Sequence, residues 1–76
     1  MENIYKTKDL AEAGALIIKK LQLIEIEREG KICWFLFSNK QECEKLSNQF
    51  FFGEFLVNAL EYHETLNRLK NRIFSS

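Results

Sequence analysis

The chain has 76 residues, of which 46% are hydrophobic and 29% charged, and its 11 basic side chains balance its 11 acidic ones. This composition excludes a disordered chain and predicts one small globular domain over residues 1–76. The balanced charge excludes the overall positive field that draws many proteins to nucleic acid or anionic membranes. No apolar run approaches the about 20 residues of a membrane span, and the N-terminus lacks the pattern of a signal peptide. We therefore expect a cytoplasmic protein without membrane partners.

A first helix is predicted near residues 8–21. Thr7 is a good N-cap, and Asp9 in the first turn suits the positive end of the helix dipole. A stripe with the 3.6-residue helical period follows, formed by Leu10, Gly14, Ile17, Ile18 and Leu21. Leu16 falls on the opposite side of this helix, together with the charged side chains Lys8, Glu12, Lys19 and Lys20.

A β-hairpin is predicted next, because two β-rich runs at 23–28 and 31–37 flank the turn Glu29-Gly30. A two-residue loop at this point pairs Ile26 with Cys33. One face then points to the core and carries Ile24, Ile26, Cys33, Phe35 and Phe37. The other face carries glutamates, but also the apolar side chains Leu23, Ile32, Trp34 and Leu36. A slip of one residue would exchange the two faces of a strand.

Two further helices are predicted in the second half of the chain. Asn39 with Glu42 has the spacing of a capping box for a helix over 40–50, and Asn58 with Glu61 has the same spacing before a helix over 59–73. Between them, 55–57 is a candidate third strand. The order is α-β-β-α-(β)-α, which is an α+β fold with helices packed on a short antiparallel hairpin sheet. The predicted core includes Leu10, Ile17, Ile26, Phe35, Leu46, Leu66 and Leu69.

Three short motifs are similar to those of a known family. They are YKTKDL at 5–10, the aromatic strand WFLF at 34–37, and LKNRIF at 69–74. In this order, and over nearly the whole chain, they resemble a domain-of-unknown-function family of short bacterial and phage proteins. The resemblance implies a bacterial or phage context, and it implies no activity for any residue.

The residue types that catalysis or metal binding needs are sparse. Two cysteines and one histidine do not complete a zinc site. Cys33 or Cys43 could form a thiol–imidazole pair with His63, but both cysteines fall on predicted core faces, where a thiol is inert. The three glycines are scattered and form no phosphate-binding loop. We therefore expect no enzyme activity, no metal and no cofactor, and two free, buried thiols.

An apolar surface is the first candidate for binding. Exposed apolar patches commonly mark protein contacts, and several large side chains lie off the predicted core stripes. A sheet sandwiched between helices would bury most of them instead. We expect a non-enzymatic binding or accessory domain that acts through contacts with a protein partner or a second copy of itself. The candidate contact residues are Leu16, Trp34, Phe51, Phe52 and Phe55.

A basic surface is the second candidate. The last helix carries no acidic side chain after Glu64, and its cations could align with those of the first helix and contact phosphates. Cations are also common at the C-terminus of any helix, because they favour the negative end of the helix dipole. The alternative function is therefore nucleic-acid binding through Lys19, Lys20, Arg68, Lys70 and Arg72.

Overall fold

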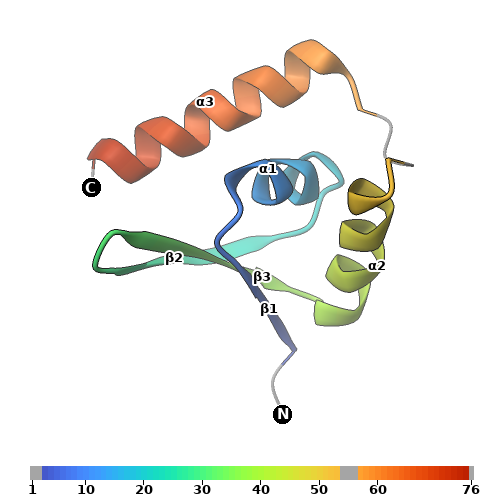
Figure 1. Cartoon of the computed structure of the whole chain (residues 1–76), viewed down its shortest axis with the longest axis horizontal. Helices are drawn as coiled ribbons and strands as arrows, with labels where there is room; N and C mark the ends of the chain where they lie inside the picture. The colour runs from blue at the N-terminus through green and yellow to red at the C-terminus, as the bar shows by residue number, and fades with distance from the viewer. Residues whose placement is uncertain (1–2, 54–56, 76) are drawn as a thin grey trace.

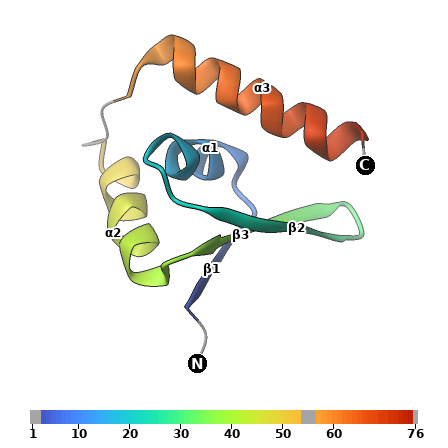
Figure 2. The same cartoon turned by 180° about the vertical axis from the view of Figure 1, so that it is seen from behind.

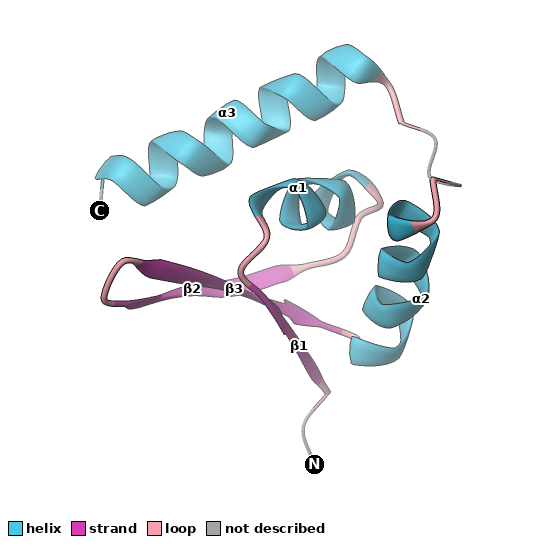
Figure 3. Ribbon diagram, viewed as in Figure 1, coloured by secondary structure: helices cyan, strands magenta, loops and turns pink. Residues whose placement is uncertain are grey.

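A computed structural model describes residues 3–53 and 57–75 of the chain. The strands form one antiparallel sheet in the order β1-β3-β2, so that β3 lies in the centre (Figure 1, Figure 3). The predicted α+β class is confirmed. In chain order the elements of this part are β1 (Ile4–Thr7), α1 (Leu10–Ile18), β2 (Leu23–Glu29), β3 (Ile32–Ser38), α2 (Lys40–Phe51) and α3 (Ala59–Ser75).

The helices are arranged in layers on one side of the sheet. α1 lies over one face of the sheet, and α3 crosses α1 on the side away from the sheet (Figure 1). α2 begins at the end of β3 and rises to the level of α1, as the view from behind also shows (Figure 2). The sheet therefore has one face towards α1 and one face turned away from it.

The start of the predicted first helix is a strand instead. Residues 4–7 form β1, which pairs with β3 from Ile4 opposite Ser38 to Thr7 opposite Phe35. Thr7 is thus not the N-cap of α1. The local sequence suits a helix start, but the backbone of this segment completes the hydrogen bonding of the central strand, and tertiary pairing overrides local propensity.

Helix α1 is shorter than predicted at both ends. Its N-cap is Asp9, whose carboxylate accepts hydrogen bonds from the backbone N–H groups of Ala11 and Glu12 at 2.9 and 3.2 Å. It ends at Ile18, and Lys20 has the left-handed φ of 73° that terminates many helices. The short helix leaves the chain free to turn directly into β2.

The hairpin between β2 and β3 is confirmed with a different register. Its turn comprises Gly30 and Lys31, with Gly30 at a φ of 63°, so the loop lies one residue later than predicted. Ile26 consequently pairs with Phe35 rather than with Cys33. The observed partner lies two residues further along β3 than the predicted one, and such a shift leaves each side chain on the same face of the sheet. The predicted faces are therefore correct for this part of the hairpin.

A β-bulge changes the faces at the start of β2. The register shifts between Leu23 and Glu25, and Leu23 pairs with Phe37. Leu23 packs against the core, whereas Ile24 is 47% exposed. The prediction that Ile24 belongs to the core and Leu23 to the other face is therefore wrong, because the extra residue of the bulge reverses the sides.

The hydrophobic core lies between α1 and the sheet. It unites buried side chains from α1, β3, α2 and α3, which are Ala13, Leu16, Phe35, Phe37, Cys43, Leu46 and Leu69. Of the seven predicted core residues, Phe35, Leu46 and Leu69 are buried. The other four are only partly buried, namely Leu10, Ile17, Ile26 and Leu66.

Leu16 is buried with 1% of its surface exposed, so the prediction that it contacts a partner is wrong. The sequence pattern assigns it to the outer side of a one-sided helix. In the structure α1 lies between the sheet and α3, and four consecutive residues, 13–16, are buried. A helix that is covered on both sides needs apolar residues all round.

Helix α3 approaches α1 closely at Gly14. A Cβ atom at this position would lie 2.7 Å from Cδ2 of Leu66 and 3.4 Å from Cε1 of Tyr62. The hydroxyl of Tyr62 donates a hydrogen bond of 2.9 Å to the carbonyl of Ala11. The small residue therefore allows α3 to pack on α1 rather than on the sheet.

The two later helices follow the sequence prediction closely. The side chain of Asn39 accepts a hydrogen bond from the N–H of Glu42, and Asn58 accepts one from Glu61. Two residues of the candidate third strand at 55–57, Phe55 and Leu56, lie outside the described part of the chain, and Val57, which is described, belongs to no strand. None of the described helices is long and apolar enough to cross a membrane.

Candidate interaction surface

The face of the sheet turned away from α1, here called the open face, carries three stripes of different chemistry. The central strand β3 places Ile32, Trp34 and Leu36 on it. The β1 side is basic, with Lys6 opposite Leu36 and Lys8 just beyond the strand. The β2 side is acidic, because the residues opposite Leu36, Trp34 and Ile32 are Glu25, Glu27 and Glu29.

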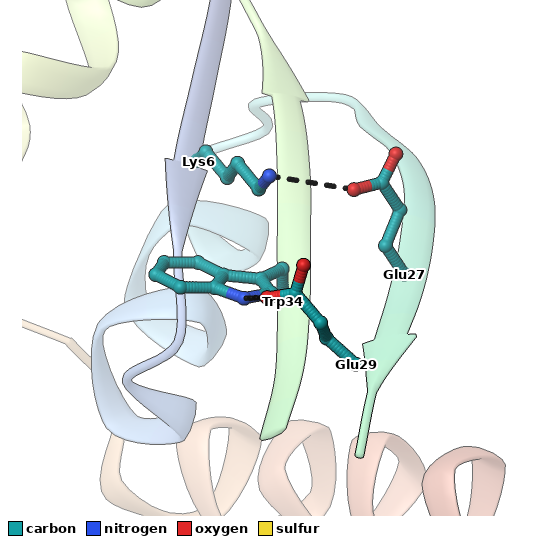
Figure 4. A network of polar contacts seen from close by, with 4 residues as sticks. All are labelled: Lys6, Glu27, Glu29 and Trp34. Atoms are coloured by element: carbon teal, nitrogen blue, oxygen red, sulfur yellow. Dashed lines mark hydrogen bonds and ion pairs between the residues drawn. The ribbon is translucent and has the colours of Figure 1, made fainter. Parts of the chain in front are cut away.

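Trp34 lies in the middle of the open face and is partly buried by side chains of its own sheet (Figure 4). Its indole N–H donates a hydrogen bond of 3.2 Å to Glu29. The ammonium groups of Lys6 and Lys8 lie 5.1 and 5.9 Å from the centre of a Trp34 ring. Lys6 also forms an ion pair of 3.4 Å with Glu27. The indole is thus surrounded by charged side chains on both sides.

These contacts around Trp34 are individually weak. The side chains of Lys6 and Glu27 are 47% and 44% exposed, and an exposed ion pair contributes about 0–1 kcal/mol. A cation above an aromatic ring at an exposed site contributes about 0.5–1 kcal/mol. The charged groups can therefore exchange these partners for others at small cost.

The predicted position of Trp34 on the hairpin's second face is confirmed. The alternative arrangement, a sheet sandwiched between helices, is not the one that the structure has, because the described helices lie on the other side of the sheet or at its end (Figure 1, Figure 2). Trp34 is shielded only in part, by the charged side chains of β1 and β2 and by none of the described helices.

The other predicted apolar contacts lie elsewhere. Phe51 and Phe52, at the C-terminal end of α2, are 83% and 73% exposed, and their rings meet edge to face at a centroid distance of 5.8 Å. This end of α2 lies at the level of α1, away from the open face (Figure 1). Phe55 lies outside the described residues. The structure therefore does not unite these phenylalanines with Trp34 in one surface.

The predicted basic contacts are all at the surface. Lys19 and Lys20 follow α1, and the three cations of α3 are exposed along that helix. Arg72 also lines a shallow pocket of about 330 Å³ beside β2, together with Arg28. The guanidinium of Arg28 donates a hydrogen bond of 2.5 Å to the carbonyl of Ile73. The sequence did not predict that Arg28 of β2 lies beside the cations at the C-terminal end of α3.

A cluster of hydrogen bonds around Glu12 was also missed. The hydroxyls of Tyr5 and Thr7 donate to the Glu12 carboxylate at 2.5 and 2.6 Å, and the hydroxyl of Ser47 donates to it as well. Burial and the hydrogen bond to Glu12 raise the pKa of Tyr5 to about 12. The helical pattern assigns Glu12 to the solvent side. In the structure its carboxylate is covered by side chains of α2, which was predicted, and of β1, which was not. The Glu12 carboxylate of α1 therefore connects β1 and α2 through hydrogen bonds.

The thiols and the imidazole are separately placed. Cys43 is fully buried and donates a hydrogen bond of 3.4 Å to the carbonyl of Ser38. Burial, and after it the charge of Glu12, raises the pKa of Cys43 to about 11. Cys33 is only partly buried, which corrects the prediction of two buried thiols. His63 is exposed on α3, with a ring nitrogen 3.2 Å from the amide of Asn67.

Nowhere in residues 3–53 and 57–75 do three or more His, Cys, Asp or Glu side chains gather in a way that could hold a metal ion. A family model described as a domain of unknown function (DUF5659) matches residues 2–75. The chain belongs to this family. No curated protein and no solved structure matches the chain. The resemblance of the sequence motifs to a domain-of-unknown-function family is thereby confirmed, and all six elements described above fall within the DUF5659 match.

Proposed function

We propose that this DUF5659 domain is a non-enzymatic binding or accessory module that acts through protein–protein contacts of the open face. The central strand β3 carries the proposal, since its side chains are apolar on both faces of the sheet. An antiparallel strand with one solvated face normally alternates apolar and polar residues. Trp34, Ile32 and Leu36 occupy the positions where polar residues are expected.

The surroundings of Trp34 support the same proposal. Protein interfaces commonly have an apolar, aromatic centre and a polar rim, and tryptophan is enriched among the residues that dominate binding energy. On the open face the indole is the centre, and the side chains of Lys6, Lys8, Glu27 and Glu29 form the rim.

The chemistry of Cys43 supports a non-enzymatic role. A buried thiol with a raised pKa is protonated and unreactive at neutral pH, and this describes Cys43. The sequence motifs support a bacterial or phage context, and the domain is proposed to work in the cytoplasm of such a cell.

The test compares Trp34→Ser with Phe74→Ser, which changes a side chain 84% exposed on α3, away from the open face. Tagged variants are cross-linked in the cells of origin, and the captured proteins, including further copies of the chain, are quantified by mass spectrometry. Loss of a contact worth about 2 kcal/mol should lower capture by Trp34→Ser about 30-fold. Phe74→Ser should capture the same proteins as the wild type.

Circular dichroism is the control for this test, because Trp34→Ser should keep the secondary structure of the wild type. Equal capture of the same proteins by Trp34→Ser and the wild type would contradict the proposal, since the centre of the open face would then contribute nothing to the contacts.

Nucleic-acid binding is a second candidate, favoured by the exposure of all five predicted cations and by the packing of α3 on α1. Reversing the charges of Arg68 and Arg72 to Glu should then weaken binding to DNA or RNA oligonucleotides, and binding should fall steeply with salt. The matched control reverses Lys40 and Lys45 on α2. Fluorescence anisotropy that shows no salt-dependent binding by the wild type would exclude this candidate.

A further inference from the structure

We propose that the partner of the open face is a second copy of this chain, packed face to face about a two-fold axis that lies in the interface and runs parallel to β3. The inference rests on the proposed function, because it uses the same open face. What it adds is the identity of the partner and the orientation in which the partner binds. It is carried by the order of the three stripes on the open face.

The stripes make the open face complementary to itself. One side is positive through Lys6 and Lys8, the middle is apolar, and the opposite side is negative. The negative side consists of Glu25, Glu27 and Glu29. Opposite potentials steer association and fix the relative orientation of two partners, whereas like charges brought together oppose binding.

Symmetry decides how two such faces can meet. A two-fold interface brings the same patch of both subunits together. An axis within the interface and parallel to the strands places the β1 side of one copy over the β2 side of the other. An axis within the interface but across the strands places β1 over β1, so that lysines face lysines. Charge therefore selects the axis parallel to β3.

The pairing register then predicts individual contacts. Lys6 and Glu25 lie at the same level of the sheet, since both are opposite Leu36. A rotation about this axis, which lies between the two sheets and parallel to β3, keeps this level and brings Lys6 of one copy over Glu25 of the second copy. Trp34 lies on β3 itself, so the two indoles meet beside the axis. Packed sheets are about 10 Å apart, a distance that lysine and glutamate side chains from opposite copies can bridge.

The contacts within one copy do not oppose this arrangement. Lys6 contacts Glu27 and the Trp34 ring of its own sheet, but the side chains of Lys6 and Glu27 are nearly half exposed. Releasing an exposed ion pair costs about 0–1 kcal/mol. On association the ammonium groups exchange one carboxylate for another, while the apolar stripe leaves water.

The first experiment measures molecular mass by sedimentation equilibrium up to millimolar concentration. The wild type should approach twice its 9.0 kDa as the concentration rises. Two variants, Lys6→Glu with Lys8→Glu and Glu25→Lys with Glu27→Lys, should each weaken the dimer about tenfold or more, because each makes both sides of the open face alike in charge. Trp34→Ser should weaken it as well.

The decisive measurement mixes the two charge-reversed variants in equal amounts. One variant is acidic on both sides, and the other has a positive net charge on both sides although it keeps Glu29, so the mixture should form a heterodimer with an affinity close to that of the wild type. Lys40→Glu with Lys45→Glu on α2 is the control, and it should leave the dimer unchanged. Circular dichroism confirms that each variant is folded.

A second measurement needs no variant. A carbodiimide joins amines to carboxylates that are in contact, and it is applied to a mixture of ¹⁵N-labelled and unlabelled wild-type chains. Isotopically mixed cross-links between Lys6 and Glu25 support the dimer. Cross-links found only within single chains at millimolar concentration contradict it.

The outcomes separate this inference from the proposed function. A wild type that stays monomeric, but whose capture of a different protein depends on Trp34, overturns the second copy as partner and leaves the proposed function standing. A dimer that is insensitive to Trp34→Ser and to both charge reversals uses another surface and overturns this inference, whereas the proposed function is contradicted only when the capture of other proteins is also independent of Trp34. Folded variants that fail to associate when mixed overturn the orientation about β3.

Discussion

The two faces of the sheet differ in what covers them, although the same strand supplies the centre of both. Phe35 and Phe37 of β3 point towards α1 and are 1% and 0% exposed. Trp34 and Leu36, their neighbours in sequence, point to the open face and are only partly buried. The apolar alternation of a strand therefore does not by itself show which face is the core. The packing of a helix decides it.

The polar groups on the two sides differ in the same way. On the covered side Glu12 accepts hydrogen bonds from hydroxyls of β1 and α2. In the described part of the chain, no buried side-chain nitrogen or oxygen lacks a hydrogen-bond partner. On the open face the ion pair between Lys6 and Glu27 is nearly half exposed. The hydrogen bonds to Glu12 therefore stabilise the fold, whereas Lys6 and Glu27 are accessible to a partner.

The largest expected effect tests this difference on one strand. Phe35→Ala should lower the free energy of unfolding by about 3–5 kcal/mol, because it opens a cavity in the buried cluster. Trp34→Ala should cost less in the monomer, since the indole is only partly buried and its contacts with Lys6, Lys8 and Glu29 are weak. Urea unfolding, at a protein concentration too low for the proposed dimer to form, measures the free energy of unfolding of both variants. Equal losses would show that the two faces are equally buried and would break the comparison.

A smaller loss is expected at the polar contact on the covered side. Glu12→Gln keeps the size of the side chain but replaces one acceptor oxygen with a donor, so it leaves hydroxyls of Tyr5, Thr7 or Ser47 without their acceptor. The free energy of unfolding should fall by about 1–3 kcal/mol. Glu44→Gln, exposed on α2, is the matched control and should change it little. A neutral Glu12→Gln would mean that the cluster contributes no net stability.

The sequence predicts what depends on near neighbours. Residues a few positions apart predict the helix caps at Asn39 and Asn58 and the hairpin. They also predict which side chains of the hairpin point to the core, such as Ile26 and Phe35. The sequence also predicts that Trp34 lies on the second face of the hairpin, but strand 31–37 is apolar on both sides, so the sequence leaves open whether a helix covers that face.

What the sequence did not predict depends on distant pairing. The segment Ile4–Thr7 is short, lies directly before a real helix and contains a good capping residue, so only its pairing with β3 makes it a strand. The Glu12 cluster needs both this strand and Ser47, which is 35 positions away in the sequence. Leu16 appears misplaced on a one-sided helix, and its burial requires α1 to be covered on two sides.

The effect of pH should distinguish the covered side from the open face. In the folded state the pKa of Cys43 is raised from 9 to about 11, and that of Tyr5 from 10 to about 12. The folded state therefore holds more protons than the unfolded state between pH 9 and 12, and stability falls as the pH rises through this range. The stabilisation is fully present below pH 9.

The measurement is urea unfolding of each variant at pH 8, 10, 11 and 12. Tyr5→Phe should have a shallower decline between pH 10 and 12 than the wild type, and Cys43→Ala between pH 9 and 11, each relative to its own stability at pH 8. Declines as steep as that of the wild type in both variants would show that these two groups are not the source of alkaline unfolding.

The smallest expected effect is at the bulge of β2, where it tests which of two neighbouring residues, Leu23 or Ile24, faces the core. Ile24 is 47% exposed, and its replacement by Thr keeps a β-branched side chain, so the free energy of unfolding should change by less than about 0.5 kcal/mol. Leu23 packs against the core beside Phe37, and Leu23→Thr should cost about 1–2 kcal/mol through lost apolar burial. A regular hairpin without the bulge would reverse this order, because the two neighbours would exchange faces. Urea unfolding of the two variants at neutral pH therefore shows directly whether Leu23 or Ile24 belongs to the covered side.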